Sequence, residues 1–231
     1  MQRMEWTLDG RPCRLYRRGE PRFLLLQMAD AYDLEGMAGE METLCAATGA
    51  PFLLAALPVR DWNGDLSPWP APPVFGDQAF AGRAAETLAW LREKALPEIL
   101  ASCSLPEGLP VILGGYSLAG LFALWAAHEA QGFDGVAAAS PSVWFPDFSA
   151  YAARQPIRAR AVYLSLGDRE EKTKNPVMRQ VGACIRALHG QYAADPRIKT
   201  VLEWNEGNHF RDADKRTGKA FAWTMEALLQ G

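Results

Sequence analysis

Short apolar runs recur along the chain and predict the buried strands of one sheet. Each run is continuous and does not alternate with polar residues, which is the pattern of strands covered on both faces. Between the runs, apolar residues recur at helical spacing. The predicted strands are residues 22–28, 51–59, 110–115, 135–140, 161–166 and 199–204, and the predicted helices are residues 33–48, 79–101, 118–131, 176–190 and 212–229. This alternation indicates an α/β fold with a mostly parallel sheet and helices on both faces.

Two more polar strands are predicted near the N-terminus, over residues 3–8 and 12–17, with Asp9-Gly10 as the turn. We expect this antiparallel hairpin at the edge of the sheet. No internal repeat, low-complexity tract or block of like charges marks a linker. A chain of 231 residues that is 49% hydrophobic can bury one large core. We therefore expect residues 1–231 to form a single domain.

The stretch VRDWNGDLSPWPAPPVFGD, residues 59–77, interrupts this alternation. Its four prolines argue against a helix or a central strand, and its two tryptophans argue against disorder. A loop of this length in a compact domain is usually functional. We expect it to cover the crevice at the carboxyl ends of the strands, where α/β proteins bind ligands. A packed surface loop without ligand contact is the alternative.

Composition narrows the classes of partner. A formal net charge of −3 gives no electrostatic reason to bind nucleic acid or an anionic membrane. No segment approaches the ~20 apolar residues of a membrane span, and the first ten residues lack the apolar stretch of a signal peptide. The cysteines are scattered without metal-ligand spacing, at Cys13, Cys45, Cys103 and Cys184. We expect reduced thiols, no metal and a cytoplasmic protein.

The segment VILGGYSLAG, residues 111–120, places Ser117 between a predicted strand and a predicted helix. A phosphate-binding loop would need a lysine after the second glycine, and a dinucleotide fingerprint would need a glycine where Tyr116 stands. The remaining pattern is the nucleophile elbow, G-x-S-x-G, in which a serine sits in a tight turn between strand and helix. Ala119 replaces the second glycine. We predict Ser117 as a nucleophile, the alternative being a helix N-cap serine.

A serine nucleophile needs a base to take its proton and an acid to orient that base. In a fold of this kind the chain order is serine, acid, histidine. His128 and His189 lie in predicted helices, whereas His209 lies in a glycine-bearing loop after the last predicted strand. We expect His209 to be the base. For the acid we prefer Glu170, because its distance from the preceding strand lets the loop turn back, and Asp168 is the alternative.

Acyl transfer also requires N–H donors for the developing oxyanion. The Leu118 amide, directly after the nucleophile, is one expected donor. The other is expected from the loop after the strand at 22–28, which points to Ala29, with Met28 as the alternative.

Several segments match one known family in the same order along the chain. They are GGYSLAGLFALWA (114–126), FDGVAAASPSVWF (133–145), LGDREEKTKNP (166–176) and EGNHF (206–210), with GDLSPWP (64–70) as a further match. In these segments the chain resembles a group of α/β-hydrolase esterases that includes siderophore esterases, feruloyl esterases, S-formylglutathione hydrolases and mycolyltransferases. The resemblance implies an α/β-hydrolase fold with Ser117 as nucleophile, His209 as base and Glu170 as acid. It also implies that Trp144 lies beside the acyl or leaving-group pocket.

These observations together predict a serine carboxylic-ester hydrolase that acts on a small acyl ester through an acyl-enzyme, without a cofactor. Asp61, Trp62 and Trp69 stand where siderophore esterases carry a polar, arginine-rich loop, which favours a neutral or cationic substrate. Alternatively, Asp61 and Asp65 only cap turns and the tryptophans only pack. The alternative functions are an acyltransferase with the same acyl-enzyme and a hydrolase-fold protein that binds a ligand without catalysis.

Overall fold

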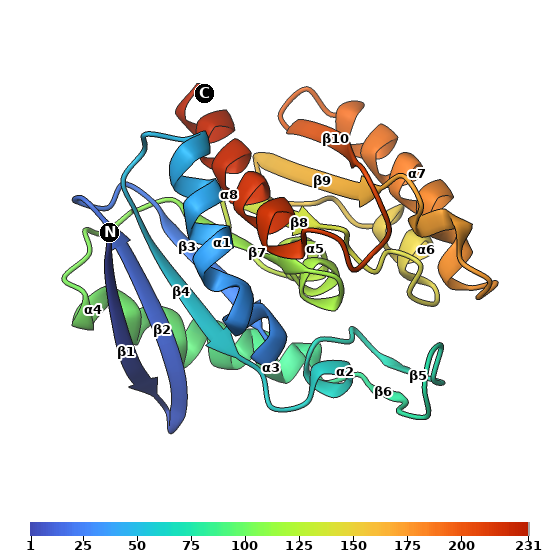
Figure 1. Ribbon diagram of the computed structural model, residues 1–231, viewed down its shortest axis with the longest axis horizontal. Helices are drawn as coiled ribbons and strands as arrows, with labels where there is room; N and C mark the ends of the chain where they lie inside the picture. The colour runs from blue at the N-terminus through green and yellow to red at the C-terminus, as the bar shows by residue number, and fades with distance from the viewer. Residues whose placement is uncertain (231) are drawn as a thin grey trace.

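Eight strands form one sheet in residues 1–230, the part of the chain that the computed structural model describes (Figure 1). The strands are β1 (Gln2–Leu8), β2 (Arg11–Arg18), β3 (Leu24–Ala29), β4 (Phe52–Pro58), β7 (Val111–Tyr116), β8 (Gly135–Ala139), β9 (Ala161–Gly167) and β10 (Lys199–Asn205). Their order is β1-β2-β4-β3-β7-β8-β9-β10. The pairs β1–β2 and β2–β4 are antiparallel, and every pair from β4 to β10 is parallel. The predicted mostly parallel sheet with an edge hairpin is confirmed.

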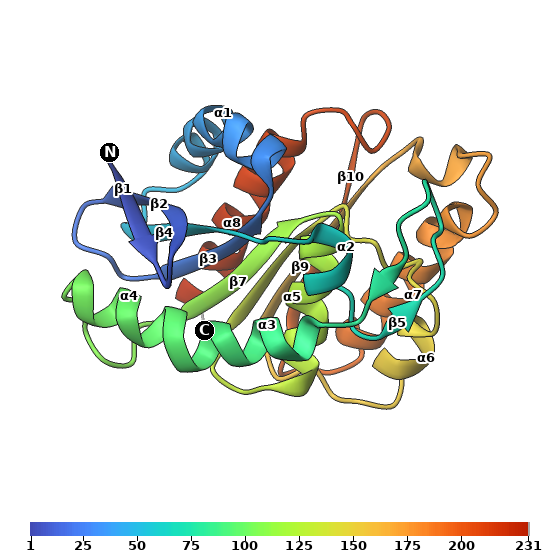
Figure 2. The same cartoon turned by 90° about the horizontal axis from the view of Figure 1, so that it is seen from below.

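Helices cover both faces of this sheet (Figure 2). The helices on one face are α1 (Ala31–Ala47) and α8 (Ala213–Leu229), and those on the other are α3 (Ala84–Trp90), α4 (Leu96–Ser102), α5 (Leu118–Glu129), α6 (Phe148–Ala152) and α7 (Val181–Ala193). Successive residues of β3 alternate between the two layers. Leu24, Leu26 and Met28 belong to the core on the α5 side, and Leu25 belongs to the core under α1 and α8. This two-sided burial accounts for the continuous apolar runs.

The helix predicted over residues 79–101 is divided in the structure. Its first residues are extended, because Phe80–Ala81 pairs as β6 with Pro70–Ala71, the short strand β5. A single π-helical turn, Leu91–Ala95, joins α3 to α4. The turn lies just before Pro97, which has no N–H to continue the regular hydrogen-bond pattern.

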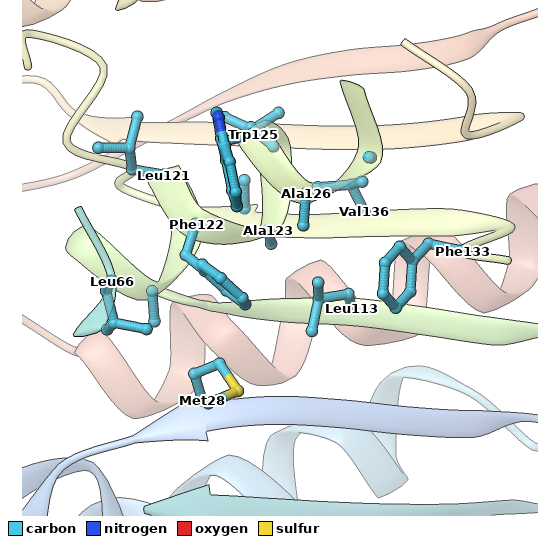
Figure 3. Packing of buried hydrophobic residues seen from close by; sticks show 14 of the residues in the cluster. Met28, Leu66, Leu113, Leu121, Phe122, Ala123, Trp125, Ala126, Phe133 and Val136 are labelled. Carbon is cyan, nitrogen blue, oxygen red and sulfur yellow. The ribbon is translucent and has the colours of Figure 1, made fainter. Parts of the chain in front are cut away.

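The 59–77 loop contains more regular structure than the sequence indicated. Besides β5 it holds α2 (Trp62–Asp65), a single helical turn whose N-cap Asp61 accepts a hydrogen bond from the Gly64 amide at 3.1 Å. Our prediction of no helix here was wrong, because a proline stops a helix from continuing through it and restricts the residue before it, whereas this turn already ends at Asp65, ahead of Pro68. Leu66 anchors the loop in the core next to Phe122 (Figure 3).

Within residues 1–230, no helix is both long and apolar enough to cross a bilayer. The same residues include no group of three or more His, Cys, Asp or Glu side chains arranged to hold a metal ion. The four cysteines are all free, and Cys13 is the buried one.

The side chain of Phe122 joins α5 to the sheet and gives a test of the core. It is fully buried and points from α5 toward Met28 of β3, beside Leu113 of β7 (Figure 3). We expect Phe122→Ala to lower the free energy of unfolding by about 3–5 kcal/mol, because it removes buried apolar surface and leaves a cavity. Leu229→Ala, at a side chain that is 40% exposed, is the control and should change it by less than about 0.5 kcal/mol. Denaturant unfolding measures both, and equal effects would contradict this packing.

Candidate active site

Ser117 lies in a sharp turn between β7 and α5. Its backbone has φ +55° and ψ −117°, a strained conformation for a residue with a side chain. Gly115 lies two residues earlier, where an added Cβ would come within 2.6 Å of the Ala119 Cβ. The turn therefore tolerates alanine at position 119 because position 115 carries no side chain.

Three side chains from three loops form a continuous hydrogen-bonded chain at the carboxyl ends of the strands. Ser117 Oγ lies 3.0 Å from His209 Nε2, and His209 Nδ1 lies 2.7 Å from Glu170 Oε2. Glu170 follows β9 and His209 follows β10. Parallel strands end at the same edge of a sheet, so residues far apart in sequence meet there.

The second carboxylate oxygen of Glu170 is held by three donors. Oε1 accepts hydrogen bonds from the Gly167 amide at 2.7 Å, Ser140 Oγ at 2.8 Å and Arg216 Nη1 at 2.9 Å. Burial by itself would raise the pKa of Glu170, but the hydrogen bond and charge of His209 and the donors at Gly167 and Ser140 outweigh it, so the pKa is lowered. The buried carboxyl is therefore kept ionised beside His209.

Arg216 of α8 links this carboxylate to the neighbouring loops. Nη1 also donates to the Tyr116 hydroxyl at 3.1 Å, and Nη2 donates to the carbonyls of Glu206 and Asn208, each at 3.1 Å. The Tyr116 hydroxyl in turn donates to the His209 carbonyl at 2.8 Å. Sequence reasoning missed Arg216. The available signal was a charged residue on the face of the last helix that is otherwise apolar, which indicates a buried partner.

Asp168, the alternative acid, does not contact His209. It is exposed, and its Oδ1 accepts a hydrogen bond from the Gly207 amide at 2.8 Å. The Arg169 amide adds a bond to the Gly207 carbonyl at 3.1 Å. Asp168 therefore shapes the loop that carries His209, while Glu170 meets the imidazole.

The SPSVW segment, residues 140–144, contributes from a loop after β8. Ser142 Oγ lies 3.2 Å from Ser117 Oγ, and its amide donates to the Ser117 carbonyl at 3.0 Å. Ser140 contacts Glu170 as described above, and Trp144 lines the cavity next to Ser117. Sequence reasoning singled out Trp144 here but missed both serines.

The two expected oxyanion donors differ in how they are placed. Leu118 is the first residue of α5, so its amide has no acceptor within the helix. The Ala29 amide is not free in this way. The Ala29 carbonyl accepts a hydrogen bond from the Val59 amide, on the β4 side, and the N–H and C=O of one strand residue point to the same side. The Ala29 amide is therefore directed toward β4, and the structure does not bring it to Ser117. The Met28 amide, by the same alternation, is directed toward β7. Asp30, the residue after Ala29, lines the cavity beside Ser117, and its amide donates to Asp33 Oδ2 at 3.1 Å.

A cavity of about 430 Å³, the Ser117 cavity, opens beside the Ser117 hydroxyl. Its walls are mostly aromatic, and its polar members besides Ser117 are Asp30, Asp33, Ser142 and His209. The aromatic side chains are Tyr32, Trp62, Phe75, Tyr116, Trp144 and Phe210. Neither lysine nor arginine is among the described residues that line it. Tyr32, Phe75 and Phe210 are also exposed, so aromatic side chains of the cavity wall reach the protein surface.

Asp61 and Trp69, expected at the substrate, do not line this cavity. Asp61 caps α2 and pairs with Arg83 Nη2 at 2.7 Å, and Asp65 pairs with the same nitrogen at 2.9 Å. Trp69 donates through Nε1 to the Pro146 carbonyl at 3.0 Å. These three side chains hold the 59–77 loop in place, which matches the alternative that they cap turns and pack. Of the loop residues we named, Trp62 is the one that reaches the cavity.

A scan against protein-family models gives no match, and a search of curated proteins gives no significant match. Solved structures do share the fold. An IroE-like serine hydrolase from Shewanella oneidensis superposes with a TM-score of 0.78 at 13% identity, over 96% of this chain and 79% of that one. The siderophore hydrolase EstB from Aspergillus nidulans gives 0.69 at 16% identity, over 96% and 92% of the two chains. The enterobactin esterase FES from Shigella flexneri gives 0.68 at 16% identity, over 98% of this chain and 59% of that one. The chain has the α/β-hydrolase fold.

Proposed function

We propose that this protein is a serine carboxylic-ester hydrolase that works through an acyl-enzyme. The observation that carries the proposal is the hydrogen-bonded chain from Ser117 through His209 to Glu170, with the serine at an elbow and facing a cavity. A serine, a base and an orienting acid in this geometry are the parts that nucleophilic acyl transfer requires. The likeness to esterases and serine hydrolases supports the same reaction class.

In the proposed mechanism His209 Nε2 takes the proton of Ser117 as Oγ attacks the ester carbonyl carbon. His209 Nδ1–H donates to Glu170, whose negative charge stabilises the imidazolium that forms. When the tetrahedral intermediate collapses, the carbon–oxygen bond to the alcohol breaks and His209 protonates the departing alcohol. A water molecule, deprotonated by His209, then attacks the acyl carbonyl carbon. The bond from that carbon to Ser117 Oγ breaks, His209 returns the proton to Oγ, and the acid leaves.

The negative charge on the tetrahedral oxygen needs a donor, and we assign the Leu118 amide to this role. Such a donor is worth about 10²–10³-fold in rate. The aromatic walls of the Ser117 cavity favour a small acyl ester with apolar parts. Two of the similar structures are named for siderophore or enterobactin hydrolysis. The absence of lysine and arginine among the described residues lining this cavity argues against an anionic substrate here.

The first prediction concerns the nucleophile and the base. Ser117→Ala and His209→Ala should each lower kcat for p-nitrophenyl acetate by about 10⁴-fold or more, because the members of such a unit act together. Labelling by a fluorophosphonate probe should vanish in Ser117→Ala. Ser149→Ala and His189→Ala, which change residues outside the Ser117 cavity, are the matched controls and should retain labelling and turnover. A folded wild-type protein that no fluorophosphonate labels would contradict the proposal.

A second prediction separates the two acids. Glu170→Gln keeps the shape of the side chain but removes the charge that stabilises the imidazolium, so kcat should fall by about 10⁴-fold. Asp168→Asn removes the same charge two residues away and should cost less than about tenfold. Steady-state kinetics on both variants, with folding checked by circular dichroism, measures the difference. The reverse order of effects would assign the acid to Asp168.

A third prediction concerns Arg216 as a positioning residue. Arg216→Met leaves Glu170 buried without its cation and should lower the free energy of unfolding by about 3–5 kcal/mol. Arg216→Lys keeps the charge but lacks the fork that spans Glu170 and the two loop carbonyls. In Arg216→Lys we expect kcat to fall while KM changes little, because Arg216 does not line the Ser117 cavity. If kcat of Arg216→Lys falls only in proportion to the fraction of that variant that is unfolded, the role of Arg216 is purely structural.

A further inference from the structure

A second pocket of about 270 Å³ adjoins the Ser117 cavity, and we call it the acidic pocket. Both are lined by Tyr32, Asp33 and Ala213, so the two pockets lie next to each other at these side chains. The acidic pocket lies where α1 meets the start of α8. It is lined by four carboxyl side chains, Asp33, Glu35, Glu40 and Asp214, and by no lysine, arginine or histidine among the described residues.

Glu40 is the member of the acidic pocket that has an unused hydrogen-bonding atom. Its side chain belongs to a residue that is 2% exposed, and Oε2 accepts a hydrogen bond from Gln27 Nε2 at 3.0 Å. Oε1 has no hydrogen-bond partner within residues 1–230. Burial raises the pKa of Glu40 well above its usual range, and the charges of Asp33 and Asp214 raise it further. A buried carboxyl oxygen without a hydrogen-bond partner lowers the stability of the folded protein unless a donor or a cation contacts it.

Asp33 connects the two spaces. Its Oδ2 accepts the Asp30 amide at 3.1 Å, and burial, followed by the nearby Asp30 charge, raises its pKa to about 7. The same side chain lines the Ser117 cavity and the acidic pocket. Asp33 is therefore shared by the wall of the Ser117 cavity and the wall of the pocket that contains Glu40.

These features fit a ligand that carries N–H donors and a positive charge. The carboxyl groups are not arranged as a set of metal ligands within residues 1–230, which favours an organic cation. A primary ammonium supplies three donors, and hydrogen bonds between charged groups are the strongest that such a pocket can offer. Basic side chains lie at a third pocket, which adjoins the Ser117 cavity at Trp144, Met178, His209 and Phe210. Its basic residues, Arg169 and Lys172, are exposed and lie on the His209 side of the site, away from the acidic pocket.

We propose that the acidic pocket binds a primary ammonium group of the ester whose carbonyl Ser117 attacks. This inference rests on the proposed esterase function and names its substrate class: an aliphatic ester with a terminal amine separated from the carbonyl by a flexible chain. The apolar chain lies in the Ser117 cavity against its aromatic walls, and the ammonium passes Asp33 to reach Glu40 and Asp214.

Matched esters test the preference on either side of the scissile bond. On the acyl side, p-nitrophenyl 6-aminohexanoate is compared with the heptanoate, which replaces the ammonium by methyl, and with the ester of heptanedioic acid, which ends in a carboxylate. On the alcohol side, 6-aminohexyl acetate is compared with heptyl acetate. We expect kcat/KM to favour the ammonium member of at least one pair by about tenfold or more. No preference in either pair, or fastest turnover of the carboxylate ester, would overturn the proposal.

Substitutions in the acidic pocket test whether its carboxyl groups cause the preference for the ammonium ester. Glu40→Gln and Asp214→Asn preserve side-chain shape but leave a side chain that cannot carry a negative charge opposite the ammonium, and the ammonium-to-methyl ratio of kcat/KM should fall toward one in both. Glu42→Gln removes the same charge from an exposed residue of α1 outside the pocket and should leave the ratio unchanged. A ratio that falls equally in Glu42→Gln would assign the preference to overall charge and overturn the proposal.

Direct binding distinguishes failure of this proposal from failure of the esterase function. Calorimetric titration of the Ser117→Ala protein with hexylammonium should show binding about tenfold tighter than with 1-hexanol or hexanoate. If no ester is hydrolysed but hexylammonium binds with this preference, the esterase function fails and the cation site stands. If esters are hydrolysed but hexylammonium binds no tighter than hexanol, the acidic pocket has no such role.

Discussion

The buried ion pair between Glu170 and Arg216 holds the candidate active site together. The two side chains are 5% and 1% exposed, so both charges have lost their water. Removing ions from water costs several kcal/mol each, and only excellent geometry with further hydrogen bonds offsets it. Here most of the remaining lone pairs and protons find partners in Gly167, Ser140 and Tyr116 and in two loop carbonyls, whereas Arg216 Nε has no hydrogen-bond partner within residues 1–230. The loops after β7, β8, β9 and β10 are thereby connected at one point.

The elbow at Ser117 places a second constraint on the same edge of the sheet. A strained serine persists only where its surroundings over-determine the backbone. The surroundings here are fully buried β7, fully buried Ala119 and the absence of a side chain at Gly115. The contact between Ala119 and Gly115 shows why the pattern tolerates alanine in place of the second glycine. The strained Ser117 therefore contacts one nitrogen of the His209 imidazole, and the buried Glu170 carboxylate contacts the other.

Much of the fold could be predicted from the sequence because its strands are buried on both faces. A continuous apolar run as short as the one in β3 is typical of a buried strand, and the helices between the strands show their own periodicity. Ser117, Glu170 and His209 could also be predicted from the sequence, because chain order and position in a loop leave only a few candidates for each role. The structure brings these three side chains into one hydrogen-bonded chain.

Other parts of the site could not be predicted, because the sequence does not show where an amide or a side chain points or which distant residue it contacts. Ala29 lies where a donor was expected, yet the strand register points its amide toward β4. Asp61 and Trp69 have suitable chemistry, but their partners, Arg83 and the Pro146 carbonyl, lie far along the chain. The acidic pocket arises from the packing of α1 against α8, two helices that are far apart in the sequence. Three-dimensional contacts between distant segments decide all of these cases.

The position of Arg216 after the other site residues has a consequence for synthesis on the ribosome. The serine, its acid and its base appear in that order, and the arginine that holds the acid follows them in α8. A nascent chain therefore contains Ser117 long before it contains the groups that would activate it. Packing of α8 on the sheet completes the hydrogen bonds around Glu170. Under the proposed function, a growing chain thus stays inactive toward esters until α8 has emerged and folded.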